Sequence, residues 1–208
     1  IEGIDIIIFD IQDVGARFYT YLSTLHYAME AASRSNKKII ILDRPNPNSF
    51  YIDGPVLEKE NSSFIGLHPV PIVYGMTIGE YGKMINEEGW LGEKMKADLE
   101  VIKIENYTHN MRYDPPVRPS PNLPNLQSIY LYPSLAFLEK TEVSVGRGTK
   151  IQFQIYGHPD FKRGFSFTPM PNFGSQYPKL NGKLSFGEDL REYETNKIIE
   201  LKWLIKSY

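Results

Sequence analysis

Two short apolar runs on either side of one amphipathic segment constrain the fold of this chain most strongly. Residues 4–9 and residues 39–42 are largely β-branched runs, which are typical of strands buried on both faces. Between them, apolar residues recur at helical spacing from Tyr21 to about Ser35, which predicts an amphipathic helix. The pattern predicts a strand–helix–strand unit with parallel strands and a right-handed connection.

The two predicted strands both end in acidic residues. Asp10 follows the first strand and Asp43 follows the second. Because parallel strands of one sheet point the same way, both carboxylates are expected at one edge of the sheet. Open α/β sheets bind their ligands at that edge, so we expect a polar site there.

The pattern changes beyond Asp53, and we place a domain boundary between there and the next predicted helix. That helix covers residues 77–89 and opens with a capping-box sequence, and a strand is expected over residues 99–104. The prolines of residues 115–124 exclude a helix interior and a central strand. This segment is either a linker or a rigid wall beside a pocket.

The C-terminal part mixes the two kinds of pattern. Residues 151–156 alternate apolar and polar side chains, which predicts a half-buried strand. A further strand is expected over residues 165–168 and a final helix over residues 196–207. The fold class is therefore α/β, with a parallel α/β part followed by a smaller α+β part.

Charge and composition exclude several function classes. The net charge of -2 gives no basic surface of the kind that attracts nucleic acid or anionic membranes, so no nucleic-acid partner is expected. The absence of cysteine excludes disulfides and thiolate zinc sites. No apolar run is long enough for a transmembrane segment. The four histidines lie far apart in sequence, so no metal is expected: His26, His68, His109 and His158.

Several catalytic motifs are missing as well. The sequence has no Gly-x-Ser-x-Gly elbow, no Walker loop and no dinucleotide fingerprint after its first strand. Serine hydrolase, NTPase and dehydrogenase interpretations therefore lose their main support. The short Gly146-Arg147-Gly148 sequence is more typical of a tight turn than of phosphate binding.

What remains is a set of carboxylate, amide, arginine and tyrosine side chains at predicted strand ends and loops. Such groups suit the hydroxyls of a sugar, and aromatic rings can cover its apolar face. Glycoside hydrolysis commonly uses two carboxyl groups. Each carboxylate can equally be a turn acceptor or a helix cap, and the arginines can simply pair with neighbouring aspartates. The set comprises Asp10, Gln12, Asp13, Arg17, Tyr19, Tyr21, Asp43, Asn46, Asn122, Glu142 and Arg147.

Six sequence blocks resemble, in unbroken order, the NamZ/YbbC family of exo-β-N-acetylmuramidases. Together they span most of the chain, from about Phe9 to Gly157. The blocks are residues 9–21 (FDIQDVGARFYTY), 42–47 (LDRPNP), 53–57 (DGPVL), 68–80 (HPVPIVYGMTIGE), 119–124 (PSPNLP) and 142–149 (EVSVGRGT).

The resemblance implies an enzyme that removes terminal N-acetylmuramic acid from the non-reducing ends of peptidoglycan glycans, without metal or cofactor. It implies that residues 1–66 are the C-terminal part of a Rossmann-like catalytic domain and that residues 67–208 are an α+β domain completing the cleft. The substrate implies a secreted, periplasmic or lipid-anchored protein in cell-wall turnover and muropeptide recycling.

The resemblance also implies roles for individual residues. Asp10 and Glu142 are the candidate catalytic carboxylates. The main acid/base glutamate is expected upstream, in a Glu-His-Gly-Phe-Arg-Gly block that this sequence lacks, so we expect a fragment without the N-terminal part whose isolated activity is in doubt. The expected substrate-binding residues are Gln12, Asp13, Arg17, Tyr19, Asn46, Tyr74, Asn122 and Arg147.

Within that set, Asn46 and Asn122 are expected on sugar hydroxyls. Tyr74 and Arg147 are expected on the sugar ring or its lactyl carboxylate. Two other functions stay open. One is a non-catalytic muropeptide-binding module. The other is a cell-wall esterase or amidase with Ser120 or Ser144 as its nucleophile.

Overall fold

The structure is a computed structural model that describes residues 2–92, 95–162 and 164–208. It divides into two compact units, Ile1–Tyr113 and Asp114–Tyr208. The first residue of the chain, Ile1, lies outside the described residues. Within these ranges no helix has the length and apolar content needed to cross a membrane.

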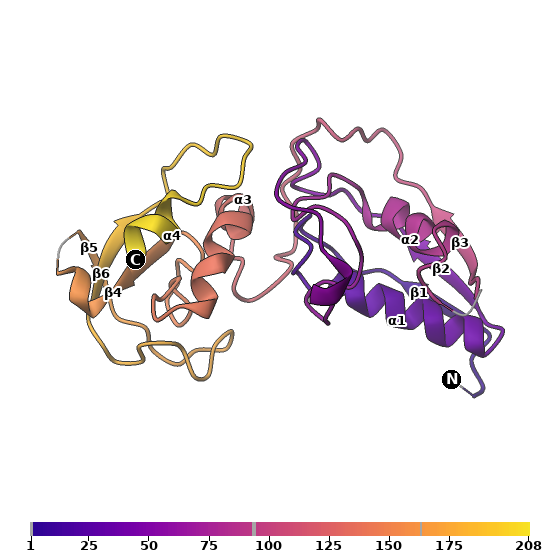
Figure 1. The fold of residues 1–208 in the computed structure, drawn as a ribbon, viewed down its shortest axis with the longest axis horizontal. Coiled ribbons are helices and arrows are strands. Elements are labelled where there is room, and N and C mark those ends of the chain that lie inside the picture. The colour runs from indigo at the N-terminus through magenta and orange to yellow at the C-terminus, as the bar shows by residue number, and fades with distance from the viewer. Residues whose placement is uncertain (1, 93–94, 163) are drawn as a thin grey trace. The chain divides into compact units, whose positions relative to one another are not determined.

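The first unit is built on a three-stranded parallel sheet (Figure 1). Its strands lie in the order β1-β2-β3, and each crossover carries a helix. The predicted strand–helix–strand unit is confirmed by the first crossover. The elements are β1 (Ile6–Phe9), α1 (Tyr21–Arg34), β2 (Lys38–Leu42), η1 (Lys59–Asn61), α2 (Ile78–Glu87) and β3 (Asp98–Ile102).

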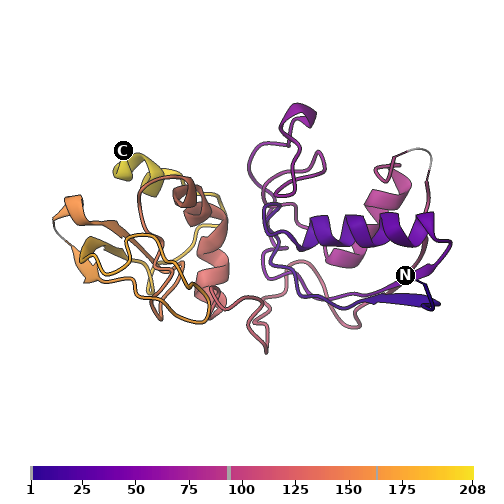
Figure 2. The same ribbon diagram turned by 90° about the horizontal axis from the view of Figure 1, so that it is seen from below.

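Helices α1 and α2 pack on the same face of the sheet (Figure 1 and Figure 2). They form the core with Ile39 and Ile41, whose side chains point from β2 to this face. Strands added in one direction with right-handed crossovers place their helices on one face. The opposite face is open in this chain, with Ile6 48% and Ile8 62% exposed. The expectation that the first strand is buried on both faces is therefore wrong for this chain.

The boundary between the compact units follows Tyr113, whereas the sequence prediction placed it after residue 66. Backbone pairing explains the difference. β3 pairs with β2 along its whole length, from Asp98 opposite Lys38 to Ile102 opposite Leu42. Because α2 packs on these two strands, residues 67–113 belong to the first unit.

The second unit contains an antiparallel sheet in the order β4-β6-β5. Helices α3 and α4 contact each other. The predicted fold class, α/β followed by a smaller α+β part, is confirmed. The elements are α3 (Leu126–Leu135), η2 (Ala136–Lys140), β4 (Ile155–His158), η3 (Pro159–Phe161), β5 (Phe165–Phe167), β6 (Ser185–Asp189) and α4 (Lys202–Ser207).

Local expectations in the second unit need three corrections. The strand predicted over residues 151–156 begins only at Ile155, because a turn precedes it in which Phe153 has a φ of 54°. The final helix is shorter than residues 196–207 and covers Lys202–Ser207. Helix α3 was not predicted; it begins with a capping box between Asn125 and Ser128.

The end of the proline-rich segment is an ordered part of the second unit. Leu123 is 1% and Asn122 is 6% exposed. The Asn122 side-chain amide donates a hydrogen bond of 2.7 Å to the Gly174 carbonyl. These contacts favour an ordered wall over a flexible linker for this part of the segment.

Candidate functional site

An exposed ion pair joins the carboxyl ends of β1 and β2. Asp10 directly follows β1, and Arg44 lies just beyond β2. Asp10 Oδ1 lies 2.6 Å from Arg44 Nε, with the side chains 43% and 37% exposed. The hydrogen bond to Asp10 raises the pKa of the Arg44 guanidinium. An exposed pair contributes little to stability, so both groups are available to a ligand.

Asp43, next to Arg44 in sequence, contacts the start of α2. Its carboxylate accepts hydrogen bonds of 2.8 Å from the Thr77 hydroxyl and from the Gly79 backbone N–H. It thus caps the N-terminus of α2, where the helix dipole favours negative charge. A Cβ atom at Gly79 would lie 2.7 Å from Asp43 Cγ, so only glycine allows this close approach. Burial raises the pKa of Asp43 against the effect of these hydrogen bonds.

Behind this edge lies a buried carboxylate. Asp13 is 3% exposed and accepts hydrogen bonds from the Gly15 N–H, at 2.7 Å, and from the Tyr74 hydroxyl. Among the described residues, its Oδ1 atom has no hydrogen-bond partner. Burial raises the pKa of Asp13 to about 6, against the hydrogen bonds, which lower it. Burial also raises the pKa of Tyr74, and the adjacent carboxylate adds to that effect.

Two amide side chains tie the loops after β1 and β2 together. The Gln12 amide donates to the Asp13 carbonyl at 2.7 Å and to the Pro45 carbonyl at 2.8 Å. Asn46 is 2% exposed; its amide donates to the Met76 carbonyl and its oxygen accepts from the Asn48 N–H. Asn46 therefore holds the loops at this edge in place. Its expected contact with a sugar hydroxyl would require these hydrogen bonds to break.

Polar groups that the sequence analysis did not single out extend this edge. His109 Nε2 lies 2.8 Å from Glu80 Oε2, with both side chains nearly half exposed. The Tyr107 hydroxyl is 2.7 Å from the Ser49 hydroxyl. The capping-box pattern at Thr77 pointed to Glu80 as a helix residue, but nothing local pointed to its histidine partner.

Arg17 and Tyr19 have mainly structural surroundings. The Arg17 guanidinium donates to the carbonyls of Pro55, at 2.9 Å, and Val70. Burial lowers its pKa. The Tyr19 ring meets the Tyr21 ring edge-on, with the centroids 5.2 Å apart. Arg17 thus anchors the loop after β1 to two distant segments.

The remaining predicted site residues lie in the second unit. Arg147 makes a two-pronged contact with Glu139, with Nε at 2.5 Å from one oxygen and Nη2 at 3.1 Å from the other. The guanidinium also lies over the Phe153 ring, 5.1 Å from its centroid. Glu142 is exposed, and within the described part of the chain its side chain has no hydrogen bond or ion pair. The Asn122 side-chain oxygen likewise has no partner there.

A lysine distant in sequence holds the segment that carries these carboxylates. The Lys179 ammonium donates to four backbone carbonyls: those of Leu138, Glu139 and Val143 at 3.2–3.4 Å, and that of Thr141. The last carbonyls of a helix lack partners within the helix. Lys179 therefore caps the C-terminal end of η2, where positive charge is favoured.

The structure thus brings five predicted residues together at one edge of the first unit and holds three others in the second unit. The first group is Asp10, Gln12, Asp13, Asn46 and Tyr74, and the second is Asn122, Glu142 and Arg147. The described residues contain no group of three histidine or acidic side chains that could hold a metal ion. The hydroxyls of Ser120 and Ser144 accept backbone N–H groups, and neither bonds a histidine within the described ranges.

Comparisons with known proteins agree along the whole chain. Residues 1–127 match the family described as exo-beta-N-acetylmuramidase NamZ, N-terminal, and residues 130–207 match its C-terminal counterpart. The chain is 45% identical, over an alignment of 225 residues, to the peptidoglycan beta-N-acetylmuramidase NamZ of Bacillus subtilis (strain 168). That alignment covers 97% of this chain and 52% of the relative, so the chain spans about half the length of the curated relative.

Two solved structures share the fold. Both are DUF1343 family proteins from Bacteroides fragilis NCTC 9343. One has a TM-score of 0.94 and 47% identity, and covers 98% of this chain and 59% of its own. The other has a TM-score of 0.83 and 28% identity, with coverages of 99% and 58%.

Proposed function

The chain belongs to the exo-β-N-acetylmuramidase NamZ family, and from this premise we propose that the protein containing it removes terminal N-acetylmuramic acid from the non-reducing ends of peptidoglycan glycans. The observation that carries the proposal is the match of residues 1–127 and 130–207 to the N-terminal and C-terminal parts of one family. The close relative from Bacillus subtilis, named as a peptidoglycan beta-N-acetylmuramidase, supports the same reaction and substrate class.

The carboxyl edge of the first sheet supports a glycosidase site. Asp10 offers an exposed carboxylate, and its partner Arg44 offers the planar N–H fork that suits a lactyl carboxylate. Asp13 lies behind them, and burial raises its pKa to about 6, where a carboxyl group can hold or release a proton. Its burial assigns it a supporting role through Tyr74, without direct contact with the sugar.

The second unit contributes three groups to the proposal. Glu142 is the exposed second carboxylate, and Arg147 is the cation held in place by Glu139. The Asn122 side-chain oxygen has no hydrogen-bond partner among the described residues, but Asn122 is 6% exposed, so its contact with a sugar would need a local opening. We propose that the main acid/base glutamate comes from a part of the protein outside these 208 residues, because they contain no Glu-His-Gly-Phe-Arg-Gly block.

The proposed substrate also suggests a cellular location for the protein. Peptidoglycan lies outside the cytoplasmic membrane, so we propose a secreted, periplasmic or lipid-anchored enzyme that acts in cell-wall turnover and muropeptide recycling. Fractionation of cells expressing the full-length protein with an epitope tag would test the location. Recovery in the cytoplasmic fraction alone would contradict it.

The decisive experiment compares two forms of the protein on two chromogenic substrates. The 208-residue chain and a protein extended to the full length of its relatives are assayed on the glycosides of N-acetylmuramic acid and of N-acetylglucosamine. We expect the extended protein alone to release the chromophore, and only from the muramic acid glycoside. Equal turnover of both sugars, or no turnover by a folded extended protein, would refute the proposed activity.

A further inference from the structure

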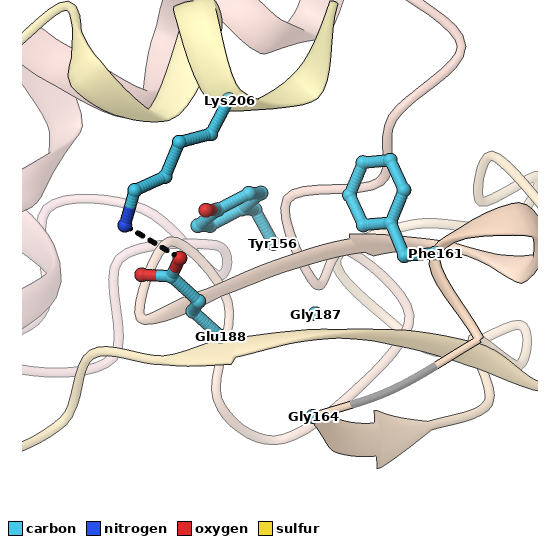
Figure 3. A pocket seen from close by; sticks show the side chains of 6 residues that line it. All are labelled: Tyr156, Phe161, Gly164, Gly187, Glu188 and Lys206. Carbon is cyan, nitrogen blue, oxygen red and sulfur yellow. Dashed lines mark hydrogen bonds and ion pairs between the residues drawn. The ribbon is translucent and has the colours of Figure 1, made fainter.

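The second unit contains a pocket that none of the predicted site residues lines. It has a volume of about 530 Å³ and lies between the antiparallel sheet, η3 and α4 (Figure 3). Ligand pockets of proteins typically measure ~300–1,000 Å³, so this one is large enough for a small ligand. It is lined by Tyr156, Phe161, Gly164, Gly187, Glu188 and Lys206.

An ion pair forms the polar side of the pocket. Lys206 Nζ, from α4, lies 2.9 Å from Glu188 Oε1, from β6, and the side chains are 57% and 39% exposed. Figure 3 shows the lysine reaching down toward the carboxylate beside the Tyr156 ring. Tyr156 stands opposite Glu188 in the strand pairing. Burial, reinforced by the Glu188 carboxylate, raises the pKa of the Tyr156 hydroxyl, so it stays protonated.

Glycine backbone forms the floor of the pocket, and an aromatic ring forms its far wall. Gly187 pairs directly with Gly157 across β6 and β4, and a Cβ atom at Gly187 would lie 1.7 Å from the Tyr156 carbonyl oxygen. No side chain can therefore fill this floor. Phe161 is half-buried and meets the Tyr156 ring edge-on, with the centroids 6.5 Å apart, so part of its ring remains available.

The chemistry of these groups selects a class of ligand. A ligand with a single charge would pair with one member of the Lys206–Glu188 pair and separate it from the other. A neutral ligand that carries both donors and acceptors can bridge the ammonium and the carboxylate without separating them. An aromatic ring at the other side suits a ligand with an apolar face. Pyranose sugars combine both properties.

We infer that this pocket is a second saccharide site, which holds a neutral N-acetylglucosamine unit of a glycan chain away from the residues assigned to catalysis. The choice of this sugar rests on the proposed function, since peptidoglycan glycans alternate N-acetylglucosamine with N-acetylmuramic acid. Phe161 supplies the stacking surface, and Glu188 and Lys206 bond the hydroxyls and the acetamido group.

The test uses the full-length protein and a neutral probe, the linear tetramer of N-acetylglucosamine, which lacks muramic acid. Binding is measured by isothermal titration calorimetry for the wild type, Phe161→Ala and Lys206→Met. We expect each variant to weaken binding about tenfold, because a lost ring face or hydrogen-bonding charge costs roughly that factor. Phe173→Ala is the matched control, since Phe173 belongs to the same unit, is 96% exposed and does not line this pocket.

The hydrolysis of the chromogenic muramic acid glycoside is measured in parallel, because that small substrate does not extend to a second site. Unchanged turnover in Phe161→Ala together with weaker tetramer binding supports the inference. If the wild type binds the tetramer through Phe161 but hydrolyses nothing, the proposed function fails and this site stands. If the wild type shows no saturable binding of the tetramer, or if both variants bind as it does, the site is refuted even when hydrolysis proceeds.

Discussion

Asp10 and Asp13 lie in one loop, yet their surroundings give them opposite properties. Asp10 is 43% exposed and shares its charge with Arg44. Asp13 is 3% exposed, and its Oδ1 atom lacks a partner among the described residues. An ionised carboxylate held in this way costs stability at neutral pH. Groups with shifted pKa values of this kind concentrate at functional sites, which favours Asp13 as a working part of the edge.

At the residue scale, replacement of Asp10 tests the proposed chemistry directly. We expect Asp10→Asn in the full-length protein to lower kcat on the chromogenic muramic acid glycoside by roughly 10²-fold or more, the usual effect of removing an acid or base group. The matched control is Asp5→Asn, because Asp5 is exposed and lies at the other end of β1. Equal kcat values in Asp10→Asn and the wild type would remove Asp10 from the mechanism.

A second prediction at this scale concerns pH and stability. Asp13 titrates near 6 in the folded state, above its ordinary value of 3.8, so its protonated form is favoured by folding. Its contribution to the free energy of unfolding is complete below about pH 3.8 and is lost as the pH rises through 6. At 1.36 kcal/mol per pKa unit, the loss is about 3 kcal/mol.

The measurement is urea unfolding of the wild type and of Asp13→Asn between pH 4.5 and pH 8. We expect the variant to gain stability relative to the wild type as the pH rises, because asparagine does not ionise. His68 works in the opposite direction, since burial lowers its pKa to about 3, but that contribution cancels in the comparison. A difference between the two proteins that stays constant with pH would contradict the prediction.

At the scale of single elements, helix ends organise both candidate regions. The N-terminus of α2 holds Asp43 through Thr77 and Gly79. The C-terminal end of η2 is held by Lys179, and η2 carries Glu139, the partner of Arg147. In both places an unpaired end of a helix bonds a charge that comes from elsewhere in the chain.

Removal of the lysine cap should therefore loosen the segment around Glu139. We expect Lys179→Met to lower the free energy of unfolding of the second unit by roughly 1–3 kcal/mol, because four carbonyls lose a charged donor. Lys183→Met is the control; Lys183 is exposed and its side chain has no partner within the described residues. Urea unfolding is followed by tryptophan fluorescence in a Trp90→Phe background, which leaves Trp203, 1% exposed, as the reporter of this unit. Equal stabilities of the two variants would show that the cap contributes nothing.

At the scale of the whole molecule, two units with separate sheets follow one another along the chain. The segment between β3 and α3 contains no helix or strand, and Arg112 and Arg118 within it are exposed. Limited proteolysis requires local backbone freedom, which such segments offer more readily than packed elements. The units should therefore separate at this segment before either one is degraded.

We expect trypsin, at low concentration, to cut first after Arg112, because the bond after Arg118 leads into Pro119 and resists trypsin. Mass spectrometry of the earliest fragments identifies the cut. Arg34 serves as an internal control, because it is also an exposed trypsin site and lies at the end of α1. If cleavage after Arg34 preceded cleavage in the connecting segment, the segment would be as well held as a helix.

Local patterns in the sequence determined much of this protein. The parallel strands, α1 and the capping box of α2 follow from hydrophobic periodicity and from a side chain that bonds its own helix end, and these depend on neighbours a few residues away. The position of Asp10 beyond β1 follows from the same strand. The family resemblance rests on short blocks of sequence, so it too could be recognised without coordinates.

Only the tertiary structure decided what each polar side chain contacts. Burial separated Asp13 from Asp10, and the pairs Arg44 with Asp10, His109 with Glu80 and Arg147 with Glu139 join residues that no local pattern relates. The turn at Phe153 moved the start of one predicted strand. The pairing of β3 with β2 moved the boundary between the units. The physical reason is common to all of these: burial and pairing depend on contacts between distant parts of the chain, whereas periodicity and capping depend on neighbours.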